Sequence, residues 1–161
     1  MDADQYNQSV DKYSDNIYRF ILKNTRDEDK AKDIVQDTFE RLWIKVESVS
    51  FEKVKSYLFT TAYHVMVDVF RREKRIVDFE LVNTNDYSHT SQFTDINDIL
   101  NEAICRLPEI QRSVVLLRDY EGYSYEEIGQ ITNLSESQVK VYIFRARAYL
   151  KSYIGSIEVV I

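Results

Sequence analysis

Two helix-start signals lie eleven residues apart in the stretch SYEEIGQITNLSESQ. Ser124 precedes Glu127 by three positions, and Ser135 precedes Gln138 by three. In this S-x-x-E/Q spacing each residue of the pair satisfies the free backbone amide of the other. A helix of barely two turns must therefore end and another begin at once. Asn133 lies in the turn between them, where Gly is often found, and Asn is one of the few other residues that tolerate positive φ.

The rest of the chain also favours helices. It has three Gly and one Pro in 161 residues, and apolar residues recur every three or four positions in three stretches between residues 6 and 69. The periodicity fails over the acidic segment 77–95 and resumes at residue 96. We therefore predict an all-α fold with two small helical domains, a helical bundle at 1–76 and a four-helix unit at 96–161, joined by a flexible acidic linker at 77–95.

Several functional classes are disfavoured by composition. The single Cys105 has no partner for an internal disulfide or a thiolate metal site. No apolar run is long enough to span a bilayer, and the polar start MDADQYNQ is unlike a signal peptide. Nucleotide-binding loops, metal-binding motifs and Cys–His dyads are lacking. We expect a cytoplasmic protein that is not an enzyme, with no catalytic residues, metal or cofactor and no membrane insertion of its own.

Local positive charge stands out because the net charge is −6. Basic residues gather in the run RREKR and in the last helix, whose inner stripe is expected to be Val139, Ile143, Ala146 and Leu150. A short helix, a tight turn and a second helix with a basic outer face are typical of a helix-turn-helix that enters the major groove of DNA. The alternative is a capped hairpin with solvated cations, but Val141 and Phe144 also lie on the outer face, where apolar groups indicate a partner.

Three segments of the sequence resemble regions of bacterial sigma factors. The segment LPEIQRSVVLLRDYEGYSYEEIGQITNLSESQVKVYIFRARAYL resembles region 4, which reads the minus-thirty-five promoter element. The segment DEDKAKDIVQDTFERLW is similar to region 2.2, and YLFTTAYHVMVDVFRREKR is similar to regions 2.3 and 2.4. Their order, with no domain between the two halves, resembles the extracytoplasmic-function (ECF) group of the sigma-70 family.

The resemblance implies several protein partners. Core RNA polymerase would be contacted through its β′ clamp helices and its β flap, and an anti-sigma factor is a further expected partner. The polar outer face of region 2.2 would dock on the clamp helices, whereas we expect Trp43 to belong to the core. The residues of this face are Asp33, Gln36, Asp37, Glu40 and Arg41.

Promoter DNA is the other partner that the resemblance implies. The helix of regions 2.3 and 2.4 would capture an unstacked base of the minus-ten element and neutralise phosphates through Phe59, Tyr63, His64, Arg71, Arg72, Lys74 and Arg75. The last helix would read the minus-thirty-five element through Ser135, Ser137, Lys140, Val141, Phe144, Arg145 and Arg147. This chain departs from the family pattern in having His64 where relatives often have Asn, and Tyr142 where they often have Arg.

Two other functions remain open at this point. A stand-alone helix-turn-helix regulator would use the C-terminal half alone and bind DNA without polymerase. A sigma mimic would sequester an anti-sigma factor without binding DNA. The match to region 2.2 argues against the first alternative, and the basic face from Ser135 to Lys151 argues against the second.

Overall fold

The computed structural model describes residues 1–80 and 96–160, and within these ranges every regular element is a helix. The all-α prediction is thereby confirmed. In chain order the elements are α1 (Ala3–Thr25), α2 (Glu28–Ile44), a short 3₁₀ turn η1 (Phe51–Lys53), α3 (Val54–Glu80), α4 (Ile96–Cys105), α5 (Glu109–Val115), a π-helical turn η2 (Leu116–Tyr120), α6 (Tyr125–Thr132) and α7 (Glu136–Val160).

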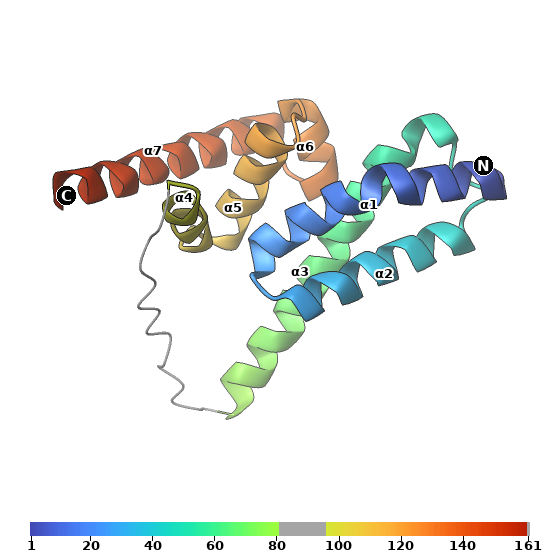
Figure 1. The fold of residues 1–161 in the computed structure, drawn as a ribbon, viewed down its shortest axis with the longest axis horizontal. Helices are drawn as coiled ribbons and strands as arrows, with labels where there is room; N and C mark the ends of the chain where they lie inside the picture. The colour runs from blue at the N-terminus through green and yellow to red at the C-terminus, as the bar shows by residue number, and fades with distance from the viewer. Residues whose placement is uncertain (81–95, 161) are drawn as a thin grey trace.

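Helices α1, α2 and α3 form the N-terminal unit, and each packs against the other two (Figure 1). An Asp2–Gln5 capping box begins α1, and the side chain of Asp27 caps α2. Their inward stripes meet in a core whose largest fully enclosed side chains are Ile17, Phe20, Ile21, Ile34, Leu42, Leu58, Phe59 and Met66. The three predicted apolar stripes therefore bury one another.

The C-terminal unit is built around α7, which packs against α4, α5 and α6 (Figure 1). Its buried side chains include Leu117 of η2, Ile128 of α6, and Val139 and Ile143 of α7. Gly122, at φ +76°, supplies the left-handed residue that lets the chain leave η2 and turn into α6. The predicted four-helix C-terminal unit is present, with η2 extending α5.

The two units are not separate bodies in this structure. Helix α3 contacts α6, and α1 contacts α4 and α5, so that a single buried cluster runs from Ile17 through Phe59 to Tyr123 and Ile143. Helix α3 also continues to Glu80, four residues beyond the boundary predicted at residue 76. The rest of the predicted linker, 81–95, lies outside the described residues.

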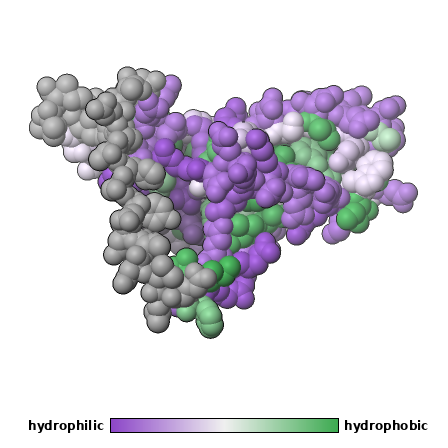
Figure 2. Space-filling model, turned by 60° about the horizontal axis from the view of Figure 1, so that its bottom comes forward, coloured by the Kyte–Doolittle hydropathy of each residue, from purple (hydrophilic) through white to green (hydrophobic). Residues whose placement is uncertain are grey.

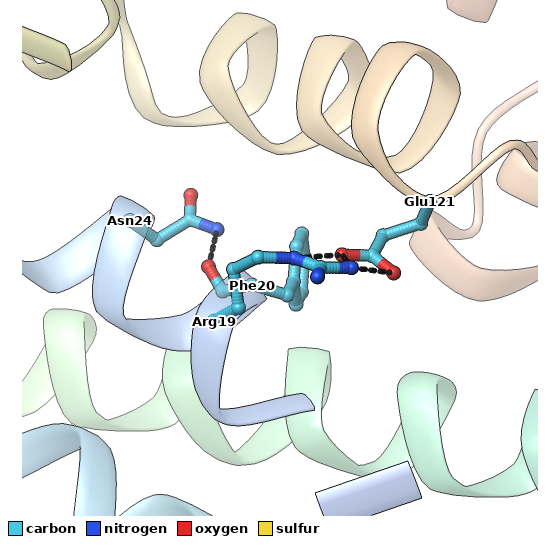
Figure 3. A network of polar contacts seen from close by, with 4 residues as sticks. All are labelled: Arg19, Phe20, Asn24 and Glu121. Carbon is cyan, nitrogen blue, oxygen red and sulfur yellow. Dashed lines mark hydrogen bonds and ion pairs between the residues drawn. The ribbon is translucent and has the colours of Figure 1, made fainter. Parts of the chain in front are cut away.

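We call this contact between the units the seam, and polar groups cross it at several points. Arg19 forms an ion pair with Glu121 at 2.9 Å (Figure 3), and Arg26 forms one with Glu102 at 2.8 Å. Asn24 is almost fully buried, and its amide nitrogen donates to the carbonyl oxygen of Phe20 (Figure 3). The seam is therefore held by both apolar and polar contacts.

A second buried polar cluster joins α1 to α5. The Asn24 Oδ1 atom accepts hydrogen bonds from Arg112 Nε at 3.2 Å and from Ser113 Oγ at 3.1 Å. All three residues are buried, and burial lowers the pKa of Arg112, although nearby Cys105 and Glu109 oppose the shift. Arg112 still carries its charge because arginine does not lose its proton in proteins. A cation is thus enclosed between the units.

Two neighbouring residues of α2 should respond differently to truncation. Leu42 is fully enclosed, so Leu42→Ala should lower the free energy of unfolding by about 2 to 5 kcal/mol. Trp43 is 52% exposed and contributes mainly an edge contact with Tyr6, so Trp43→Ala should cost only about 0.5 to 1.5 kcal/mol. Urea unfolding followed by circular dichroism measures both values. An equal loss for the two variants would contradict this assignment.

Candidate functional site

The helix-turn-helix forms as the sequence predicts. Ser124 and Glu127 exchange hydrogen bonds of 3.1 Å at the start of α6, and Ser135 and Gln138 exchange bonds of 3.0 and 3.1 Å before α7. Asn133 has φ +59°, the left-handed conformation expected for the turn. Both capping signals and the turn residue are confirmed.

Close backbone approach fixes the angle between the two helices. The backbone N–H of Leu134 donates to the carbonyl oxygen of Gly129. A Cβ atom added at Gly129 would lie 2.7 Å from the carbonyl oxygen of Leu134, which is backbone and cannot rotate away. Gly129 is therefore required for this turn, and the capping pattern gave no indication of it.

Helix α7 presents the two faces that the sequence predicts. Val139, Ile143 and Ala146 are buried, and Leu150 is half-buried. All seven residues predicted for minus-thirty-five contact point outward and are exposed to solvent: Ser135, Ser137, Lys140, Val141, Phe144, Arg145 and Arg147. Phe144 is 75% exposed and Val141 45% exposed, so an apolar strip lies between the cations.

The cations of α7 differ in what holds them. Arg147 forms a two-bond ion pair with Asp119 of η2, which raises the pKa of its guanidinium. Lys140 makes only a loose contact of 3.5 Å with Glu136 and lies 5.6 Å from the ring of Tyr125. Arg145 has no ion pair or hydrogen bond with any described residue. Arg147 is thus tied into the fold, whereas Arg145 is available to a ligand.

The predicted polymerase-facing residues lie together on the outer side of α2. Asp33, Gln36, Glu40 and Arg41 are exposed, and Asp37 is half-buried. They pair along the helix, since Arg41 Nε donates to Asp37 Oδ1 at 3.1 Å and Gln36 Nε2 donates to Glu40 Oε1 at 3.3 Å. Pairs at i, i+4 are neighbours on the helix surface, so these contacts restrain the side chains without burying them.

The expectation that Trp43 belongs to the core is wrong. Its ring meets Tyr6 edge-on at 5.0 Å, but about half of the residue remains exposed in the last turn of α2. Ile44, the final residue of the helix, is 80% exposed. Spacing places both on the C-terminal end of the face that carries Gln36 and Glu40. This face therefore has a polar stretch and an apolar end.

Two of the predicted minus-ten residues do not lie on an open surface. Phe59 is fully buried between Phe20, at 5.8 Å, and Tyr123, at 5.3 Å between ring centroids. Tyr63 is 8% exposed, and burial, followed by the charge of Glu109, raises the pKa of its hydroxyl. Helix periodicity could not reveal this, because Tyr123 belongs to the other unit. Neither ring is available for stacking in this arrangement.

The remaining minus-ten residues are open. His64 is exposed, as are Arg71, Arg72, Lys74 and Arg75 of α3. Three of these arginines line a polar groove of about 310 Å³ together with Arg41 and Asp37 of α2. The basic run and the predicted polymerase-facing residues are therefore neighbours. Polar side chains also cover most of the surface shown in Figure 2, with smaller apolar groups among them.

A hollow that the sequence did not indicate lies where the α2–α3 loop meets α3. It has a volume of about 520 Å³, and its lining residues are Ser48, Val49, Ser50, Lys53, Ser56, Tyr57 and Thr60. Tyr57 is half-buried, with its ring packed against the edge of the core. The hollow offers an aromatic ring, three serine hydroxyls and a cation on the side of α3 that remains open.

The described residues contain no group of three or more His, Cys, Asp or Glu side chains placed to hold a metal ion. Within the same ranges, no helix has the length and apolar character needed to cross a membrane. The features that stand out are therefore the exposed faces of α2, α3 and α7.

Comparison with known proteins identifies both units. Residues 10–76 match the family model Sigma-70 region 2, and residues 97–150 match Sigma-70, region 4. The ECF RNA polymerase sigma factor SigM of Bacillus subtilis is 32% identical over 145 residues, covering 87% of this chain and 89% of the relative. The chain belongs to the ECF sigma factors. SigW of the same organism is 26% identical to this ECF sigma factor, over 93% of the chain and 89% of the relative.

Solved structures agree with this family. The sigma factor RpoE of Bartonella quintana, in complex with the anti-sigma factor NepR, superposes with a TM-score of 0.79 at 25% identity, over 93% of this ECF sigma factor and 96% of that chain. The fold of CnrH, solved with the cytosolic domain of CnrY, is also similar, with a TM-score of 0.68 at 22% identity over 94% and 88% of the two chains.

The helix-turn-helix geometry predicts a contrast between two glycines of the ECF sigma factor. Gly129→Ala should force the α6–α7 turn apart and lower the free energy of unfolding by about 2 kcal/mol or more. Gly155→Ala, also in a helix, meets nothing within 4 Å and should be neutral or stabilising by up to about 1 kcal/mol. Thermal unfolding of the two variants measures the difference. Equal effects would show that the close contact does not constrain the turn.

Proposed function

We propose that this sigma factor directs promoter-specific initiation through three helices: α2 on core polymerase, α3 and its preceding loop on minus-ten DNA, and α7 on the minus-thirty-five element. The N-terminal unit would serve the first two roles and the C-terminal unit the third. The observation that carries the proposal is the outer face of α7, where Val141 and Phe144 remain exposed beside Lys140 and Arg145.

The composition of that α7 face fits the major groove of DNA. Lysine and arginine donate to phosphates and to guanine edges, while apolar side chains contact thymine methyl groups. Arg145 is the best candidate for a base contact, because it has no competing ion pair among the described residues. Arg147 would have to break its ion pair with Asp119 before it could contact DNA. We therefore assign it mainly to holding α7 against η2, and only secondarily to contact with a phosphate.

The outer face of α2 fits a protein partner. Its charged and polar side chains suit reversible docking on the β′ clamp helices, where complementary charge speeds association. Trp43 and Ile44 add an apolar end of the kind that often dominates binding energy at interfaces. The β flap is the proposed polymerase contact of the C-terminal unit.

The open side of α3 fits single-stranded DNA. We propose that an unstacked base of the minus-ten element enters the hollow beside Tyr57 and Thr60, while His64 and the basic run lie along the backbone. Stacking on aromatic rings and neutralisation of phosphates are the usual means of holding a single strand. Tyr57 thus replaces Phe59 as the stacking candidate.

Two further features follow from this role. The protein would act in the cytoplasm, where polymerase and promoter DNA are found. An anti-sigma factor is a proposed partner, supported by the likeness to RpoE, whose structure was solved with one. A stand-alone helix-turn-helix regulator would not need the α2 face or the match to Sigma-70 region 2, and a sigma mimic would not need the basic face of α7.

The test of the function is pull-down with core polymerase followed by run-off transcription from a genomic library. The wild-type chain should bind polymerase and yield transcripts that share two upstream elements. Asp37→Ala combined with Arg41→Ala should weaken polymerase binding by about tenfold, because interface charges are lost, while changing stability by under about 0.5 kcal/mol.

The matched control for that double variant is Asp11→Ala combined with Lys12→Ala. It removes one acid and one base from exposed positions of α1, so the net charge is unchanged in both variants. The control should bind polymerase like the wild type. Tight, sequence-specific binding of free protein to promoter DNA, equal to that with polymerase, would instead favour the stand-alone regulator.

The α7 assignment predicts different behaviour for two arginines. Arg145→Ala should cost about 1 to 3 kcal/mol of promoter binding and relax preference at one minus-thirty-five position. Arg147→Ala should lower the free energy of unfolding by up to about 1 kcal/mol, because it removes an exposed ion pair, and should weaken all promoters alike. Transcription from a library randomised across the minus-thirty-five element measures both. If promoter preference and transcript yield are unchanged in both variants, the cations of α7 are only solvated and do not contact DNA.

A further inference from the structure

A cavity of about 550 Å³ lies beside α1, where α1 approaches α4. Its lining residues are Tyr18, Arg19, Leu22, Lys23, Arg26, Glu28 and Asn101. None of them belongs to the surfaces assigned above to polymerase or to DNA. Small-molecule sites have volumes in this range and combine apolar walls with a few placed polar groups. The cavity therefore has the size and the mixed lining of a ligand site.

Three cations of α1 line the cavity on one side of the helix. Arg19, Lys23 and Arg26 are spaced by four and three residues, which places them in one row. The outer two form ion pairs, Arg19 with Glu121 at 2.9 Å and Arg26 with Glu102 at 2.8 Å. Lys23, in the middle, forms no ion pair with any described residue.

The ammonium of Lys23 is contacted by neutral groups instead. It donates to Oδ1 of Asn101 at 3.1 Å and lies 4.6 Å from the centroid of the Tyr120 ring. Lys23 is half-buried, and this burial lowers the pKa of its ammonium, as does the charge of Arg19, whereas Glu121 opposes the shift. A partly desolvated cation without a carboxylate partner gains more from an added anion than a solvated one does.

Both arginines keep donors for the same anion. Arg19 binds Glu121 through Nε and Nη2, so its Nη1 makes no hydrogen bond with any described residue (Figure 3). Arg26 uses Nη1 for its bond to Glu102. Because a guanidinium has five N–H donors, each arginine can keep its own carboxylate and still donate to a ligand. Along the helix the row of three cations spans about 10 Å, at 1.5 Å per residue.

We propose that this cavity binds a small phosphorylated ligand of the nucleoside polyphosphate class. A row of this length needs several anionic oxygens, which successive phosphoryl groups supply and a single carboxylate does not. Phosphate oxygens would bind Lys23 and the unused donors of Arg19 and Arg26, while Tyr18 and Leu22 would cover the less polar base and sugar. Such binding needs neither polymerase nor promoter, so the proposal goes beyond promoter recognition.

Calorimetric titration of the free chain with ATP, in buffer without divalent cations, tests the site. Asn101→Asp places a carboxylate of the same shape at Lys23 and should weaken ATP binding by about tenfold, because the ammonium is then already paired. The matched control is Asn7→Asp, which adds the same charge at an exposed position of α1 and should change the affinity by less than about twofold.

Variants of the cation itself supply a second comparison. Lys23→Ala should weaken ATP binding by about tenfold, and Lys23→Arg should stay within about threefold of the wild type, because it keeps the charge and the donors. Circular dichroism checks that each variant folds. The proposal requires Lys23→Arg to bind ATP more tightly than Lys23→Ala.

Two partial ligands separate the halves of the cavity. Inorganic pyrophosphate should bind through the cations alone, so Asn101→Asp should weaken it and Tyr18→Ala should not. ATP should lose about fivefold in affinity in Tyr18→Ala, because an aromatic wall for the base is removed. Adenosine, which has no phosphate, should show no measurable binding.

Several results would overturn the site. One is the absence of saturable binding of ATP and pyrophosphate to the wild type, and another is equal ATP affinity in Asn101→Asp and Asn7→Asp. Binding that survives Asn101→Asp but is lost when Arg71→Ala is combined with Arg75→Ala would place the anion on the basic run of α3. Because the titrations use the free chain, a failure of promoter recognition in the run-off assay leaves their outcome unaffected.

Discussion

The turn from Asp119 to Tyr123 fixes the positions of three helices at once. Asp119 holds Arg147 of α7, Glu121 holds Arg19 of α1, and the ring of Tyr123 packs on Phe59 of α3. The π-helical turn η2 and the left-handed Gly122 point these side chains in different directions. Arg118 fastens the turn itself by donating to the carbonyl oxygen of Tyr123 at 2.9 Å. The placement of α7, whose outer face we propose reads DNA, and the cover of α3 thus depend on one short segment.

Periodicity and capping predicted most of the fold and which sides of α2 and α7 are exposed. They sufficed for α2 and α7 because an outward position on an amphipathic helix is set by its own sequence. They failed for Phe59 because Tyr123, which packs on its ring, lies about 60 positions away in the other unit, and they did not reveal the burial of Tyr63. Trp43 failed for a different reason: helical spacing places it with Gln36 and Glu40 on the exposed side of α2, where its ring meets Tyr6 but stays about half exposed.

The seam also explains why the prediction of two separate helical domains was incomplete. Each unit has its own apolar stripes, and those patterns do not say whether the units touch. Contact depends on isolated polar residues such as Asn24, Arg112 and Ser113, which in the sequence look like ordinary helix residues. A mixture of apolar rings with rim ion pairs and enclosed polar groups is typical of contacts that form and separate, rather than of a permanent core.

Positive charge in this acidic chain is therefore divided between two uses. Arg19, Arg26 and Arg112 are engaged at the seam, and Arg147 braces α7 against η2. Arg145 has no such partner within the described residues. A count of basic residues would treat these side chains alike, whereas the electrostatic attraction available to DNA comes mainly from cations whose charge is not already neutralised by a nearby carboxylate.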